Sequence, residues 1–214
     1  MAHLGKAAVF WLAALMAPVA AQAAPVCAGY AQELAGMRES AEALRVGVDY
    51  LAPPEDALAA RRIEQLEWVE RQNAARLAEL LDACGWPGPG VGARAAGLAW
   101  ALAQTASTDL PFQRRLLRHL ESAVAHRQAP VLYLAITTDR VALLEERPQL
   151  FGTQLRQVDA CNWNYYPLDD RKQVELRRKE AGLPPLEDYK RGINDMIVKE
   201  NCPVPLPEAS SSPQ

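Results

Sequence analysis

The sequence lacks the short motifs that mark common catalytic and cofactor sites. It contains no P-loop and no glycine-rich dinucleotide fingerprint, and no serine stands in a G-x-S-x-G elbow. We therefore expect no cofactor. The cysteines form no C-x-x-C pair, and only His119 and His126 follow the N-terminal region, so no metal site is expected. Neither histidine has an acidic partner at helical spacing, and both are interpreted as surface or core residues.

An excess of charge and long apolar runs are also missing. The 214 residues include 23 Lys and Arg against 26 Asp and Glu, which gives a formal net charge of −3. This balance provides no electrostatic attraction for nucleic acid or an anionic membrane, so neither is expected as a partner. No later apolar run reaches the roughly 20 residues of a transmembrane helix, so the mature chain should have no membrane span.

The N-terminal region has the three parts of a secretory signal peptide. Lys6 contributes to a short basic start, residues 7–19 are apolar, and residues 21–23 read Ala-Gln-Ala, an A-x-A cleavage site. We predict a signal peptide at residues 1–23, cleaved near Ala24, and hence a periplasmic or secreted protein. An uncleaved anchor is the alternative interpretation.

The remaining 191 residues suit one domain with a full core, which we expect at 24–202. The tail 203–214 is rich in Pro and Ser and is expected to be disordered. An even number of cysteines in an exported chain predicts two disulfide bonds. The cysteines concerned are Cys27, Cys84, Cys161 and Cys202.

Apolar residues recur at helical spacing along most of the chain, which predicts a mainly α-helical bundle. Trp86 in a Gly- and Pro-rich turn is expected to close one end of the core. Residues 149–158 and 161–167 alternate instead, which predicts a small β-hairpin or paired extended loop. The expected helices cover residues 28–50, 55–84, 91–107, 112–127, 131–146, 171–181 and 186–201.

The first two helices give a disulfide pairing. They are long, of similar length and joined by a short Pro-Pro link, which favours an antiparallel hairpin. Cys27 begins the first helix and Cys84 ends the second, so the hairpin brings them together. We predict a Cys27–Cys84 bond, which leaves Cys161 to pair with Cys202. Bridges over loops this long stabilise by about 3–5 kcal/mol each.

Asp139 and Arg140 stand inside an otherwise aliphatic helix. Adjacent helical residues point about 100° apart, so these two cannot simply pair with each other. A side chain that faces inward needs a distant partner. The structural interpretation, which we prefer, is an ion pair of Asp139 with Arg177 or Arg178. The functional interpretation is a ligand-binding or catalytic acid beside a guanidinium.

The helix runs into a polar segment around Gly152, which is either a plain turn or a recognition loop. Gln149, Thr153 and Gln154 supply amides and a hydroxyl, groups that suit a neutral polar ligand. No residue is assigned a catalytic role. The hypothetical binding residues are Asp139, Arg140, Gln149, Thr153, Gln154, Arg177 and Arg178.

An ordered set of motifs resembles a bacterial domain family of unknown function. The set comprises Gly-Trp-Pro at 85–87, Gln104, Gln113, Asp-Arg at 139–140, Gln149, Phe-Gly-Thr-Gln at 151–154, Arg-Arg at 177–178, Gly-Leu at 182–183 and Tyr189. The resemblance spans roughly residues 70–189. It implies a mainly helical domain and a site, and names no chemistry.

The chain departs from that family pattern at three positions. Thr105 and Ser107 stand where the family has His and Asp, and Phe151 stands where it has Tyr. A His–Asp pair would be the natural acid–base unit, so its loss favours a binding role over catalysis.

We therefore expect a binding or interaction module of the cell envelope, whose partner is an unknown polar ligand or an envelope protein. One alternative is a hydrolase or transferase that acts on an envelope substrate through Asp139 and Arg140. The other is an immunity or inhibitor protein, which would expose an apolar patch.

Overall fold

The computed structural model describes residues 27–48, 56–92, 94–158 and 162–197. Within them the chain is mainly α-helical with one small two-stranded sheet, as the sequence predicted. The expected signal peptide, the expected Cys161–Cys202 bond and the expected disordered tail lie outside the described residues. No helix in the described ranges is long and apolar enough to cross a membrane.

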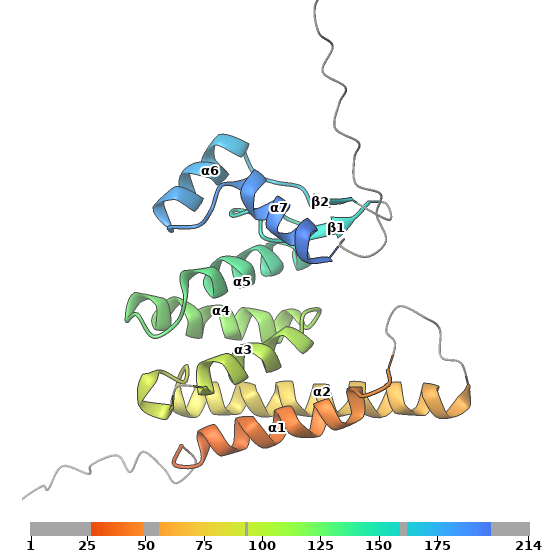
Figure 1. The fold of residues 1–214 in the computed structure, drawn as a ribbon. Coiled ribbons are helices and arrows are strands. Elements are labelled where there is room, and N and C mark those ends of the chain that lie inside the picture. Colours follow the sequence, from red (N-terminus) through yellow and green to blue (C-terminus); the bar gives the residue numbers. More distant parts are fainter. Residues whose placement is uncertain (1–26, 49–55, 93, 159–161, 198–214) are drawn as a thin grey trace, which may run out of the picture.

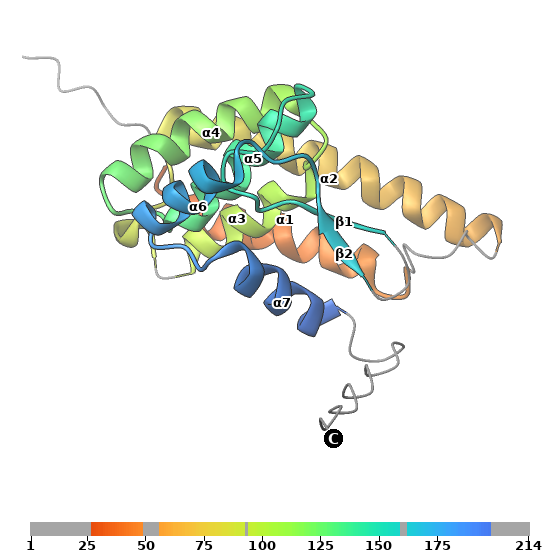
Figure 2. The same ribbon diagram turned by 90° about the horizontal axis from the view of Figure 1, so that it is seen from above.

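The first two helices form the expected antiparallel hairpin, but they are not of similar length as predicted, because the first has 16 residues and the second 28. They are α1 (Tyr30–Arg45) and α2 (Ala57–Cys84), and a Cys27–Cys84 disulfide closes their shared end. Asp56 starts α2 by accepting hydrogen bonds from two amides of its first turn. This disulfide confirms the predicted pairing of Cys27 with Cys84. Figures 1 and 2 show the first turns of α2 extending beyond the other helices.

Three further helices stack on one side of this hairpin. A short 3₁₀ turn, η1 (Pro89–Val91), precedes α3 (Ala95–Thr105), followed by α4 (Leu110–Ala125) and α5 (Val131–Leu144). Asp109 caps α4 by accepting from an amide of its first turn, so α4 begins two residues earlier than expected. Trp86 is buried in the core as predicted.

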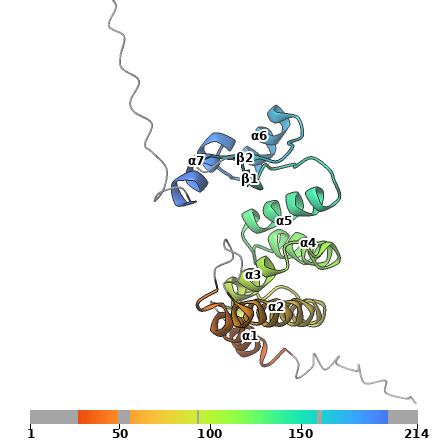
Figure 3. The same cartoon turned by 90° about the vertical axis from the view of Figure 1, so that its right-hand side faces the viewer.

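A C-terminal layer covers α5 on the side away from α4 (Figures 1 and 3). It comprises β1 (Leu155–Gln157), β2 (Trp163–Tyr165), α6 (Arg171–Glu180) and α7 (Leu186–Ile197). The strands pair antiparallel with Arg156 opposite Asn164, so the expected hairpin is confirmed, although its strands are shorter than predicted.

The main apolar cluster lies among α1 to α5 and does not include the C-terminal layer. In that layer Val174 and Leu186 are fully buried, but the connection from α5 is the polar segment 149–154. The segment that the sequence singled out is thus the joint between two stacked parts of the fold.

Candidate functional site

The carboxylate of Asp139 lies on α5 with 0% of the residue exposed and binds the segment that follows the helix. One oxygen accepts hydrogen bonds from the amides of Leu150 (2.7 Å) and Phe151 (2.9 Å). The other accepts from the amide and the hydroxyl of Thr153, both at 2.8 Å. Both oxygens are therefore occupied by four donors from one short loop.

Arg178 on α6 holds the same loop from its carbonyl side. Its guanidinium donates to the carbonyls of Phe151 (2.6 Å) and Gly152 (3.1 Å), and its Nε donates to the carbonyl of Pro184 (2.6 Å). The side chain is 1% exposed, and its guanidinium lies 4.9 Å from the ring centre of Tyr189. We call residues 149–154, held between Asp139 and Arg178, the loop clamp.

The clamp stabilises two buried charges that do not form an ion pair. Burial raises the pKa of Asp139 above its ordinary value, and the hydrogen bonds from the loop oppose that rise. Burial lowers the pKa of Arg178, and nearby groups, including the carboxylate of Asp139, oppose that fall. The peptide groups between the two side chains point N–H toward the carboxylate and C=O toward the guanidinium, so they solvate both charges.

Gln149 also stabilises the loop clamp and is fully buried. Its side-chain carbonyl accepts from the amide of Gln154 (2.7 Å), and its amide donates to the carbonyls of Gln154 and Tyr166, each at 3.1 Å. Gln149 therefore ties the loop to itself and to the end of β2. Tyr189 on α7 adds a further tie by donating from its hydroxyl to the carbonyl of Thr153 (3.2 Å).

Gly152 is required at the centre of the loop. Its φ is +64°, a conformation that favours glycine. A Cβ built on it would lie 2.5 Å from Cδ2 of Leu186. The close approach of α7 and the left-handed backbone thus both exclude a side chain.

The preferred ion-pair interpretation of Asp139 is wrong. Neither Arg177 nor Arg178 forms a salt bridge with it; Arg177 pairs with Asp169 (2.8 Å) and donates to the carbonyl of Leu150 (3.3 Å). The physical reason is that three backbone amides and a hydroxyl satisfy the carboxylate without bringing a long side chain into the core.

Arg140 points from α5 toward α3 rather than into the clamp. Its Nη2 donates to Oε1 of Gln104 at 2.9 Å, and burial lowers the pKa of its guanidinium. Its Nη1 is buried and has no hydrogen-bond partner in the described part of the chain, and the same holds for Nε2 of Gln104. No carboxylate of the described residues forms a salt bridge with Arg140.

Gln154 lies at the end of the loop clamp and contacts α5 on the turn that precedes Arg140. Its side-chain amide donates to the hydroxyl of Thr153 (3.1 Å) and, at 3.5 Å, to the carbonyl of Ile136, one helical turn before Arg140. The clamp thus fixes the position of Gln154 against α5. Six of the seven predicted residues form or contact the loop clamp, whereas Arg140 points away from it toward Gln104 on α3.

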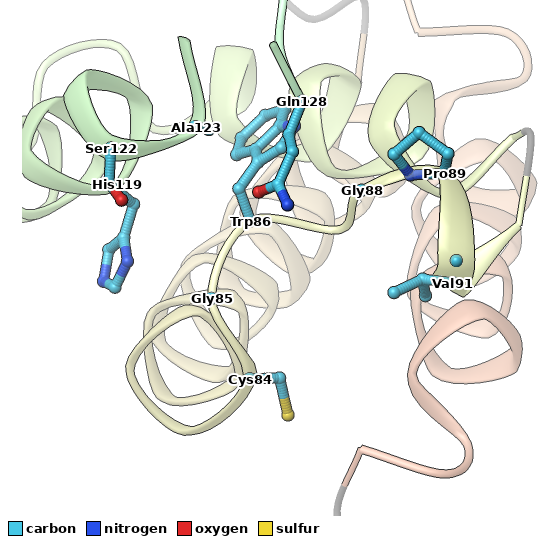
Figure 4. A pocket seen from close by; sticks show the side chains of 11 residues that line it. Cys84, Gly85, Trp86, Gly88, Pro89, Val91, His119, Ser122, Ala123 and Gln128 are labelled. Atoms are coloured by element: carbon cyan, nitrogen blue, oxygen red, sulfur yellow. The ribbon is translucent and has the colours of Figure 1, made fainter. Parts of the chain in front are cut away.

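Sequence reasoning missed a pocket at the Gly-Trp-Pro turn. Its volume is about 340 Å³, and its lining includes Trp86, His119, Ser122 and Gln128 (Figure 4). His119 Nε2 lies 2.9 Å from Oδ1 of Asp82 on α2, a partner 37 residues away that helical spacing could not reveal. No hydrogen bond joins His119 to Ser122, so the pocket holds no assembled catalytic triad.

No group of three or more His, Cys, Asp or Glu among the described residues could hold a metal ion. Gln113, another motif residue, is fully buried and donates to the carbonyls of Ala103 (3.4 Å) and Ala106 (2.9 Å). It closes the C-terminal end of α3, where helix carbonyls lack intrahelical partners, and so supports the position of Gln104.

Comparison with known proteins finds a family match. The model of DUF6624, a family of unknown function, matches residues 28–199, and this confirms the resemblance indicated by the ordered motifs. No curated protein and no solved structure matches the chain.

Proposed function

We propose that this chain, which belongs to the DUF6624 family of unknown function, is an exported binding module of the cell envelope. Its ligand, a polar small molecule or a group on an envelope protein, binds beside the loop clamp at Arg140 and Gln154. The clamp serves to hold these side chains in place.

One observation carries this proposal: Arg140, Gln104 and Arg178 at the joint each leave a buried donor without a partner within the described part of the chain, and these side chains do not titrate near neutral pH. Arg140 Nη1 and Gln104 Nε2 have no partner among the described residues. An arginine stays protonated and a carboxamide does not ionise, so neither transfers a proton readily. Such groups recognise a ligand rather than perform acid–base chemistry.

The geometry of the clamp disfavours the hydrolase or transferase alternative. That alternative needs Asp139 to exchange a proton with a substrate, which requires access and a free oxygen. Asp139 is fully buried, and both of its oxygens accept two hydrogen bonds. The carboxylate of Asp139 holds the loop through hydrogen bonds, together with the hydroxyl of Thr153 and the side-chain amide of Gln149.

Export is supported by two independent features. The first is the signal-like pattern of residues 1–23. The second is the Cys27–Cys84 disulfide, a bond that persists in oxidising compartments such as the periplasm. Cell fractionation with a C-terminal tag tests the location, and a full-length protein retained in the cytoplasm would contradict it.

Affinity capture tests the binding role. The wild-type chain is compared with Arg140→Ala and Gln154→Ala variants, and with Arg71→Ala, which removes an exposed arginine from α2. We expect the two site variants to lose a captured envelope partner or metabolite that the Arg71→Ala variant retains. If folded site variants capture the same set as the wild type, the site is wrongly placed.

A further inference from the structure

Arg140 is a partly buried arginine whose Nη1 atom is buried, and none of the described carboxylates forms a salt bridge with it. Desolvation is the influence that lowers its pKa, and no acidic group of the described residues counteracts it. Among the other buried or partly buried arginines, Arg45 pairs with Glu70 and Arg177 with Asp169, whereas Arg178 is compensated by three backbone carbonyls. A buried cation is unfavourable unless an anion or hydrogen-bond acceptors compensate it.

Gln104 is oriented by this same cation. Because Arg140 Nη2 donates to its Oε1, the amide group of Gln104 is fixed as a donor on the other side of its plane. That amide Nε2 is buried and unpartnered, like Nη1 of Arg140. Two planar groups joined by one hydrogen bond thus each leave a donor without an acceptor.

We infer that Arg140 and Gln104 bind a carboxylate group of the ligand, with one oxygen accepting from Nη1 and the other from Nε2. The inference rests on the proposed function, because it names the chemical group that the binding site recognises. The positive charge of Arg140 favours an anion, and the two planar donors match the two oxygens of a planar carboxylate.

Charge and donor number favour a carboxylate over a phosphate. One guanidinium compensates one negative charge, and a carboxylate carries one. A phosphate group carries more charge near neutral pH and has three strong acceptor oxygens. At this place the described residues supply one cation and two open donors, which would leave a phosphate partly uncompensated in a desolvated site.

The neighbouring side chains suit a flat or apolar body attached to that carboxylate. Trp100 lies one helical turn before Gln104 on α3, and Tyr133 lies two turns before Arg140 on α5. Their rings stack on each other with centroids 4.0 Å apart and planes 4° apart. Helical spacing puts this stacked aromatic pair on the same faces of α3 and α5 as Gln104 and Arg140.

Benzoate is therefore the probe, and benzamide is its neutral isostere. Binding to the purified mature chain is followed by the change in melting temperature and by titration calorimetry. We expect benzoate at millimolar concentration to bind, benzamide and inorganic phosphate to bind at least about tenfold more weakly, and Arg140→Ala to weaken benzoate binding by a similar factor.

A Gln104→Glu variant tests the same idea without a ligand. The new carboxylate would accept from Arg140 and neutralise it, so we expect a higher melting temperature and loss of benzoate binding. Gln65→Glu adds the same charge at an exposed position of α2 and should change neither the melting temperature nor benzoate binding.

The two failures can be told apart. If benzoate binds no better than benzamide and Gln104→Glu does not raise the melting temperature, the carboxylate assignment is overturned, even where affinity capture still depends on Arg140. Preferential binding of phosphate would overturn it as well. Loss of the Arg140 dependence in affinity capture would instead overturn the proposed function.

Discussion

Replacing Asp139 by alanine removes the acceptor on which the loop clamp depends. The amides of Leu150, Phe151 and Thr153 would lose their partner, and the hydroxyl of Thr153 would have to rotate elsewhere. A buried donor left unsatisfied costs about 1–3 kcal/mol. The removed carboxylate no longer has to be desolvated, which offsets part of the sum. We therefore expect Asp139→Ala to lower the free energy of unfolding by about 3–5 kcal/mol.

Two milder substitutions should each lower the free energy of unfolding by less than Asp139→Ala does. Thr153→Val keeps the shape and the backbone amide and removes one hydroxyl donor, so it should cost about 1 kcal/mol. Asp139→Asn keeps one acceptor oxygen and places an amide donor against the Thr153 amide, so its cost should lie between the other two.

Urea denaturation measures the free energies, and hydrogen exchange measures the protection of the three loop amides. Exchange at residues 150, 151 and 153 should accelerate in the order Thr153→Val, Asp139→Asn, Asp139→Ala. If Asp139→Ala costs no more than Thr153→Val, or if the loop amides keep their protection in both Asp139 variants, the carboxylate does not hold the loop.

Three other perturbations follow from the structure. Gly152→Ala should destabilise by about 2–5 kcal/mol because it adds overlap to an unfavourable φ, whereas Gly182→Ala, with a φ of +66° and open space, should cost about 1–2 kcal/mol; thermal denaturation compares them. Replacing Cys27 and Cys84 by serine opens a 57-residue loop and should cost about 4 kcal/mol, an effect that calorimetry with and without reductant can check. The guanidinium of Arg177 lowers the pKa of Asp169 below that of an ordinary carboxyl group. The contribution of Asp169 to stability is therefore present above the ordinary carboxyl pKa and is lost as the pH falls through the lowered pKa. The free energies of unfolding of wild type and Asp169→Asn, measured with urea, should converge in acid.

The helical hairpin could be read from the sequence because its evidence is local. Helix periodicity, a Pro-Pro link and two cysteines at matching ends fix an antiparallel pair without long-range information, and Cys27–Cys84 followed from them. Helix ends were predicted less well where backbone geometry decides them. α3 begins at Ala95 rather than near Val91 because a 3₁₀ turn and Gly92, with a φ of +130°, intervene.

The residues of the joint were predictable, but their partners were not. Asp139 in an apolar helix indicated an inward-facing acid, and it is fully buried. Three of its four donors are backbone amides, which every residue except proline carries and which leave no mark in a sequence. For the same reason Arg178 was expected to find a carboxylate, yet it binds the carbonyls of Phe151, Gly152 and Pro184.

The pairing of Arg140 with Gln104 also needed the fold. These residues lie 36 positions apart on α5 and α3, and no spacing rule connects them. Thr105, the position that lacks the family's histidine, donates its hydroxyl back to the carbonyl of Leu102 in its own helix. The imidazole that the motif would place beside Gln104 is thus replaced by a group that satisfies itself locally.

The polar joint has a consequence for local unfolding of the protein. Apolar packing holds α1 to α5 together, whereas the last layer is attached largely by directional hydrogen bonds around one loop. If the loop unfolds, its bonds to Asp139 on α5 and its bonds to Arg178 and Tyr189 in the C-terminal layer are lost together. The C-terminal layer should therefore detach as one cooperative unit at a lower free energy than global unfolding, while the disulfide-linked hairpin stays folded.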